Sequence, residues 1–163
     1  ETMQSPMLLL VLQVLGILSC SEYVNGLDYQ SSSKPELKYT HPFGCAIALW
    51  ESIPKGSING DVLLLHGSRY TSRTWIDLGT LEVLAKSGFR TVAIDLPGYG
   101  DSQNRMDHES DADFMVEVIK RLKMERPIVV VPSMSGKYGL PFLIEYPDLL
   151  LGFVPIAPVG ATR

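Results

Sequence analysis

The stretch that decides the fold is residues 128–136, which read IVVVPSMSG. Four consecutive β-branched residues that end at a small-residue turn are typical of a buried strand. The residues from Lys137 to Tyr146 then have the composition of a helix. A serine at a sharp turn between a strand and a helix exposes its hydroxyl above the sheet, where it can act as a nucleophile. Ser133 is therefore the candidate nucleophile.

The usual form of this motif is G-x-S-x-G, and the chain departs from it at both glycine positions. Val131 and Ser135 stand there instead. A branched side chain at Val131 is expected to crowd the turn. Taken alone, the motif also fits a serine that only caps the next helix. Ser135, the rival hydroxyl, is interpreted as structural because close packing at its position requires a small residue.

Two upstream segments favour the nucleophile. Residues 62–65 form an apolar run that ends in His-Gly-Ser at 66–68, and residues 91–95 form a second strand-like run followed by a Pro/Gly loop at 96–102. Both runs are typical of buried strands. The order of strand, His-Gly loop, helix, strand, Pro/Gly loop, helix, strand and serine turn predicts a parallel α/β sheet with helices on both faces.

These motifs resemble those of the alpha/beta-hydrolase domain-containing protein 14 family over roughly residues 37 to 160. The matching pieces are LLLHG (63–67), TW (74–75), LGTL (78–81), VAIDLPG (92–98), PSMSG (132–136), LPF (140–142) and GFVPIAP (152–158). The resemblance implies an alpha/beta-hydrolase fold, esterase-like activity and acyl transfer to a thiol such as coenzyme A. It also implies that Asp95 shapes a loop near the site and is not the catalytic acid.

The oxyanion hole of such a site should consist of two backbone N–H groups. One belongs to Met134, the residue after the candidate nucleophile. The other belongs to Ser68 in the loop after the first buried strand, with Arg69 as the alternative. Each donor typically supplies about 3 kcal/mol to the transition state. His66 and Gly67 are interpreted as residues that shape this loop, and His66 is not interpreted as the base.

In alpha/beta-hydrolases the nucleophile is followed in the chain by an acid and then by a histidine. No histidine follows Ser133. We therefore expect the N-terminal part of a longer serine hydrolase of small acyl esters or amides, truncated after the sixth strand. The alternative is a catalytically inactive short form that binds a partner. An aspartate-nucleophile enzyme is disfavoured because a serine occupies the turn.

Composition limits the other possibilities. The 163 residues suffice for one domain with a sizeable core, and 45% of them are hydrophobic. The net charge is −4 without a basic cluster, which argues against a nucleic-acid partner. Cys20 and Cys45 match no metal or redox spacing, and Cys45 is expected to be buried. We expect no metal and no cofactor beyond coenzyme A as an acyl acceptor, and the oligomeric state stays open.

The flanking elements complete the prediction. Strands are expected at 37–41, 45–50 and 151–157, and one helix is expected at 72–87. Ser72 is the candidate N-cap of that helix, and Gly88 is its C-terminal glycine. Ser110 is expected to open a further helix through a capping box. His41 and His108 are interpreted as surface residues.

The N-terminus differs from the rest of the chain. Residues 7–19 are mostly apolar, which matches the core of a signal peptide and is short for a membrane span. Residues 1–26 are therefore predicted to be a signal peptide or signal anchor, 27–36 a linker, and 37–163 the domain. The protein would then be secreted, or anchored in a membrane if the segment stays uncleaved. A buried N-terminal helix in a cytoplasmic protein is the alternative, since no positive n-region precedes the apolar run.

Overall fold

A computed structural model describes residues 32–105 and 110–160. In these ranges, six strands form one sheet in the order β1-β2-β4-β3-β5-β6. The strands are β1 (Glu36–Thr40), β2 (Ile47–Ser52), β3 (Gly60–Leu64), β4 (Phe89–Ile94), β5 (Ile128–Pro132) and β6 (Gly152–Ile156). β2 pairs antiparallel with β1 and β4, and β4, β3, β5 and β6 run parallel. The predicted mostly parallel sheet is confirmed.

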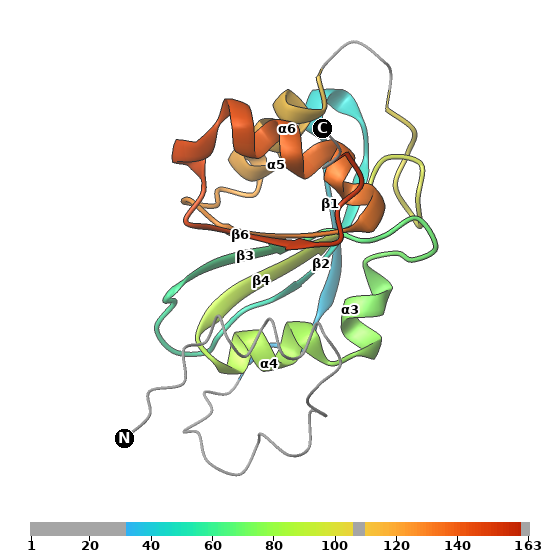
Figure 1. Cartoon of the computed structure of the whole chain (residues 1–163). Helices are drawn as coiled ribbons and strands as arrows, with labels where there is room; N and C mark the ends of the chain where they lie inside the picture. Colours follow the sequence, from blue (N-terminus) through green and yellow to red (C-terminus); the bar gives the residue numbers. More distant parts are fainter. Residues whose placement is uncertain (1–31, 106–109, 161–163) are drawn as a thin grey trace.

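Helices cover both faces of the sheet, as expected (Figure 1). On one face lie α3 (Arg73–Asp77) and α4 (Thr80–Lys86), and on the other lie α5 (Asp111–Arg121) and α6 (Gly136–Glu145). Short 3₁₀ helices connect the elements at η1 (Pro42–Gly44), η2 (Ser133–Ser135) and η3 (Pro147–Leu149). Helices are required on both faces because the strands of a parallel sheet are buried on both sides.

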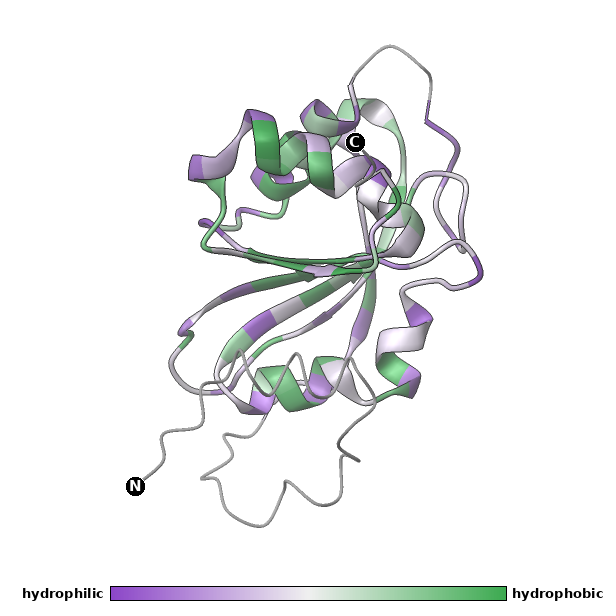
Figure 2. Ribbon diagram, viewed as in Figure 1, coloured by the Kyte–Doolittle hydropathy of each residue, from purple (hydrophilic) through white to green (hydrophobic). Residues whose placement is uncertain are grey.

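The strands divide the core into two clusters. Successive side chains of a strand point to opposite faces, so Val62 and Leu64 pack with Trp75 and α4, while Leu63 and Leu65 pack with α5 and α6. Figure 2 shows the apolar residues gathered in the strands and in the helices that cover them. Both clusters share the same strands, so the two halves of the core stabilise one sheet.

The helix predicted at 72–87 is wrong in one respect, because the segment forms two helices. Gly79 separates α3 from α4 with a φ of +73°, a conformation that favours glycine. Ser72 does not cap the helix, since its own backbone is helical and its side chain makes no capping bond. Its N–H donates instead to Asp95 Oδ1 at 2.7 Å. The expected glycine at the C-terminus is present at Gly88, with a φ of +90°.

The helix predicted after Ser110 is confirmed as α5. Ser110 Oγ accepts from Asp113 N–H at 2.9 Å, so Ser110 caps the helix. The Asp113 carboxylate accepts from the Ser110 hydroxyl at 2.8 Å, in place of the backbone N–H that a capping box uses. The apolar residues of the helix pack in the core against the sheet. Cys45 is also buried as expected.

The predicted signal segment, residues 1–26 with its apolar run at 7–19, lies outside the described residues. Of the predicted linker, residues 32–36 are described. Ser33 lies against the domain there, because its N–H donates to the Ile53 carbonyl at 2.9 Å and its hydroxyl accepts from Ile53 N–H at 2.8 Å. Within 32–105 and 110–160, none of the helices has the length and apolar character needed to cross a bilayer.

Candidate active site

Ser133 lies at the junction of β5 with η2 and α6. Its φ is +48°, in the left-handed region that residues other than glycine rarely adopt, and the residue is exposed. Ser135, by contrast, is fully buried and donates its hydroxyl to the Pro132 carbonyl at 2.7 Å. The two serines of the turn therefore differ: Ser133 is exposed and has left-handed backbone, whereas the Ser135 hydroxyl is buried in a hydrogen bond within the turn.

The crowding expected at Val131 is absent because the facing helix has no side chain there. A Cβ atom placed on Gly139 of α6 would lie 2.6 and 2.7 Å from the two methyl groups of Val131. Such distances are well inside van der Waals contact. The G-x-S-x-G motif normally has glycine at the position of Val131. Here Gly139, eight residues later in α6, leaves the space that the Val131 side chain occupies.

The loop after β3 is organised around His66, whose side chain is 1% exposed. Its Nδ1 lies 2.9 Å from the Gly67 carbonyl, and its Nε2 accepts from Leu96 N–H at 2.9 Å. This pairing requires a neutral ring with its proton on Nδ1. Burial lowers the pKa of His66, and this outweighs the opposite effects of the Gly67 hydrogen bond and of Asp95. Both ring nitrogens are occupied, so His66 is not available as a base.

Asp95 follows β4 and connects two loops. Its carboxylate accepts from Ser72 N–H at 2.7 Å and from Asp101 N–H at 3.0 Å, and the residue is 3% exposed. Its carbonyl oxygen accepts from the Ser102 hydroxyl at 2.7 Å. These bonds join Asp95 to residues of two loops, and the loop-shaping role that the resemblance implies for it stays a prediction.

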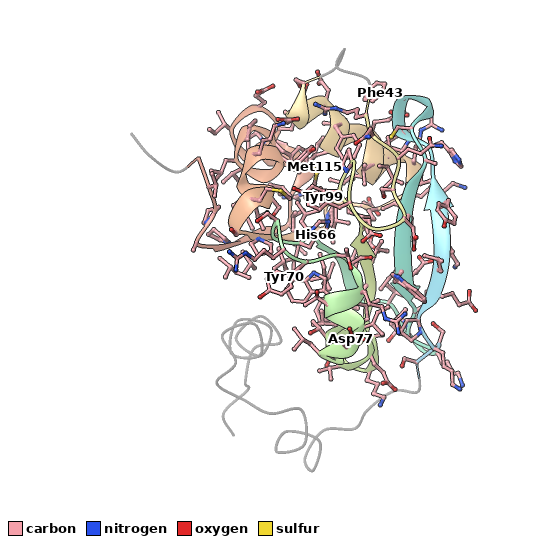
Figure 3. The ribbon with its side chains drawn as sticks, turned by 90° about the vertical axis from the view of Figure 1, so that its right-hand side faces the viewer. Phe43, His66, Tyr70, Asp77, Tyr99 and Met115 are labelled. Carbon is pink, nitrogen blue, oxygen red and sulfur yellow. The ribbon has the colours of Figure 1, made fainter. Side chains whose placement is uncertain are left out.

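The His-Gly loop and the serine turn meet at an apolar pocket. A Cβ atom on Gly67 would lie 3.6 Å from Ser133 Cβ, so the loop passes directly beside the serine. The pocket has a volume of about 180 Å³ and is lined by His66, Gly67, Tyr70, Thr74, Trp75, Leu78, Pro132, Ser133 and Ile156. In the view of Figure 3, His66 lies between Tyr99 and Tyr70, and the His66 and Tyr99 ring centroids are 5.1 Å apart.

The two expected oxyanion donors lie on the two segments that meet there. Ser68 follows Gly67, and Met134 follows Ser133. Among the described residues, neither backbone N–H has a hydrogen-bond acceptor. Both groups are therefore free to bind a ligand as far as the described residues are concerned, and their role as oxyanion donors stays a prediction.

No described residue is hydrogen-bonded to Ser133 Oγ. His41 is exposed in the segment before η1, as predicted for a surface histidine, and His108 lies outside the described residues. Among residues 32–105 and 110–160, no group of three His, Cys, Asp or Glu side chains is arranged to bind a metal ion.

Sequence reasoning missed part of this site. The sequence assigned Trp75 no place at the site, yet it lines the pocket and donates its indole N–H to the Leu65 carbonyl at 2.8 Å. Ile156 lines the same pocket from the end of β6. Only a strand order that brings β6 beside β5 could have identified it. The glycine at 139 carried a local signal, because a helix interior rarely retains glycine without a packing reason.

Comparisons with known proteins agree with this architecture. The sequence profile described as "Alpha/beta hydrolase family" matches residues 62–161, more than half of the chain. Protein ABHD14A of Danio rerio is 44% identical over 119 residues, covering 68% of this chain and 44% of that protein. The Homo sapiens protein named "Putative protein-lysine deacylase ABHD14B" is 43% identical over 122 residues, covering 71% of this chain and 58% of that protein. The chain thus spans about half the length of these curated relatives.

Solved structures show the same fold. A predicted CIB-like hydrolase from Thermoplasma acidophilum superposes with a TM-score of 0.70 at 22% identity, covering 77% of this chain and 63% of that chain. The carboxylesterase CesB from Bacillus subtilis superposes with a TM-score of 0.66 at 26% identity, covering 77% and 44%. Sheet order, serine turn, family profile and relatives agree, and the chain belongs to the alpha/beta-hydrolase family.

Proposed function

We propose that the whole protein is a serine hydrolase of small acyl esters or amides that works through an acyl-enzyme on Ser133. The observation that carries the proposal is an exposed serine with left-handed backbone, placed between a strand and a helix and lining an apolar pocket. Strained backbone conformations cluster at active sites, and Ser133 has one at the point where the loop after β3 passes beside it. The buried, hydrogen-bonded Ser135 illustrates a structural serine in the same turn.

The chemistry follows from the positions of these groups. Ser133 Oγ attacks the acyl carbonyl carbon while a base takes its proton, and the carbonyl oxygen becomes an oxyanion. The N–H groups of Ser68 and Met134 donate to that oxyanion. The tetrahedral intermediate then collapses, the alcohol or amine leaves with a proton, and an acyl-serine ester remains. Water releases the acid in the second half of the reaction.

The base and the acid that support Ser133 are proposed to come from the part of the whole protein outside the described residues. His66 cannot serve, because one ring nitrogen pairs with the Gly67 carbonyl and the other accepts from Leu96 N–H. The mechanism needs no metal, and the chain's own groups supply the nucleophile and the oxyanion donors.

The pocket supports a compact apolar acyl group as the substrate part next to Ser133. Its side-chain lining is mostly apolar, with Trp75, Leu78 and Ile156 around a volume of about 180 Å³. The deacylase wording in the name of the human relative is consistent with the removal of an acyl group. Nothing in this pocket selects between water and a thiol such as coenzyme A as the acceptor, so both acceptors belong in the test.

The test uses the whole protein and a fluorophosphonate probe, which labels activated serines. We expect Ser133→Ala to abolish labelling and the hydrolysis of p-nitrophenyl acetate. The matched control is Ser135→Ala, two residues away, which should keep both because its hydroxyl is buried in the turn. Persistent labelling of Ser133→Ala would overturn the proposal. Free acetate in the presence of coenzyme A indicates hydrolysis, whereas acetyl-coenzyme A indicates transfer.

A further inference from the structure

The chain that leaves β6 returns to the serine turn. We call residues 157–160 the return loop. Ala157 has a φ of +46°, which turns the chain back after Ile156. The N–H of Val159 then donates to the Ser133 carbonyl at 2.8 Å. Gly136, the first residue of α6, makes this approach possible, because any Cβ there would collide with the Val159 carbonyl.

The hydrogen bond from Val159 acts on a peptide group that belongs to the proposed site. The Ser133 carbonyl and the Met134 N–H are parts of one peptide unit, which is planar and trans, so the two groups point in opposite directions. Fixing the oxygen therefore fixes the direction of the N–H. Gly136 N–H also donates to the Ser133 carbonyl within the turn, so both acceptor positions of this oxygen are used.

We propose that the main-chain N–H of Val159 is a positioning group, which aims the Met134 N–H at the oxyanion by anchoring the other side of the same peptide. This inference rests on the proposed function. The hydrogen bond from Gly136 N–H restrains this peptide only relative to the turn to which both belong. Val159 supplies a restraint from β6, a separate element of the sheet. An external restraint is needed because Ser133 is in a strained conformation that persists only when its surroundings determine it.

The required change is the loss of the Val159 N–H donor with the side chain retained. Replacing Val159 by α-hydroxyisovaleric acid in the whole protein converts that amide to an ester and retains the side chain. We expect kcat for p-nitrophenyl acetate to fall at least tenfold with KM nearly unchanged, because a misaimed oxyanion donor weakens the transition state more than the bound substrate. Val159→Ala is the matched control, since it keeps the N–H and should stay within about twofold of the wild type.

A second measurement does not depend on activity. The ¹H–¹⁵N residual dipolar coupling of Met134 reports the orientation of its N–H. We expect this coupling to change in the ester variant and to remain unchanged in Val159→Ala. Wild-type coupling and kcat in the ester variant would overturn the inference. If the proposed function fails, Ser133→Ala retains its fluorophosphonate labelling. The dipolar coupling of Met134 then still decides whether Val159 orients the peptide.

Discussion

Gly139 of α6 faces Val131, the residue two positions before Ser133. Because a Cβ at this position would meet both methyl groups of Val131, we expect Gly139→Ala to destabilise the protein by about 1–3 kcal/mol through overpacking. Val131→Ala removes those methyl groups, so the double variant should lose at least about 1 kcal/mol less than the sum of the two single changes. Urea unfolding of all three variants measures this coupling.

The control for Gly139 is Gly152→Ala on β6, where a new Cβ would lie 3.4 Å from its nearest neighbour in Ile128. That change should alter the free energy of unfolding much less. If the destabilisation of the double variant equalled the sum of the destabilisations of Val131→Ala and Gly139→Ala, then Gly139 would not be what accommodates Val131.

His66 should make stability fall in mildly acidic solution. Burial lowers its pKa in the folded protein, below the value of about 6.5 for an unfolded chain. Below that pH the unfolded chain takes up a proton that the folded protein resists, so the contribution of His66 is complete above pH 6.5 and is lost as the pH falls. The free energy of unfolding, measured from pH 7.5 to 5.5, should decrease.

His66→Gln keeps an acceptor for Leu96 N–H without an ionisable ring, so its stability should depend less on pH over that range. A wild-type slope in His66→Gln would contradict the assignment.

At the scale of elements, an ion-pair cluster joins four strands at the end of the sheet opposite Ser133. Glu51 of β2 bonds Lys38 of β1 at 2.6 Å and Arg90 of β4 at 2.7 Å, and Arg90 lies 3.5 Å from Asp61 of β3. Burial alone would raise the pKa of Glu51, but the hydrogen bonds from Lys38 and Arg90 outweigh it and lower the pKa.

We expect Glu51→Gln to destabilise the protein by about 2 kcal/mol at pH 7, because its partners lose a carboxylate that is only 8% exposed. A lowered folded pKa means that this contribution is present above the unfolded value of about 4.3 and disappears as the pH falls through the folded value. The difference between wild type and variant should therefore shrink in acid. Glu36→Gln, whose carboxylate is 68% exposed, should change stability by less than about 0.5 kcal/mol.

At the scale of the whole molecule, the two core clusters should unfold together, since the same strands contribute to both. Val129 and Val130 are adjacent, fully buried and on opposite faces. We expect Val129→Ala and Val130→Ala each to lower the free energy of unfolding by roughly 2 kcal/mol. Far-ultraviolet circular dichroism and tryptophan fluorescence should give one coincident transition in both variants. Separate transitions would show that each face unfolds independently.

Much of the fold could be predicted because its signals are local. The β-branched run before Ser133 and the apolar face of α5 were sufficient for element type and order. The break at Gly79 was missed because helical periodicity continues across it. The cause is tertiary, since the Trp75 indole is bonded to the Leu65 carbonyl after β3 while α4 must lie along the sheet.

By itself, the sequence determined the parallel α/β architecture and the position of the serine turn, because periodicity and turn chemistry depend on neighbours in the chain. Only the tertiary structure decided that Gly139 accommodates Val131, that Ile156 and Trp75 meet in one pocket, and that Val159 anchors the peptide after Ser133. Each of these contacts depends on how separate strands and helices pack. Packing is set by the balance of the whole core, and no single stretch of sequence encodes it.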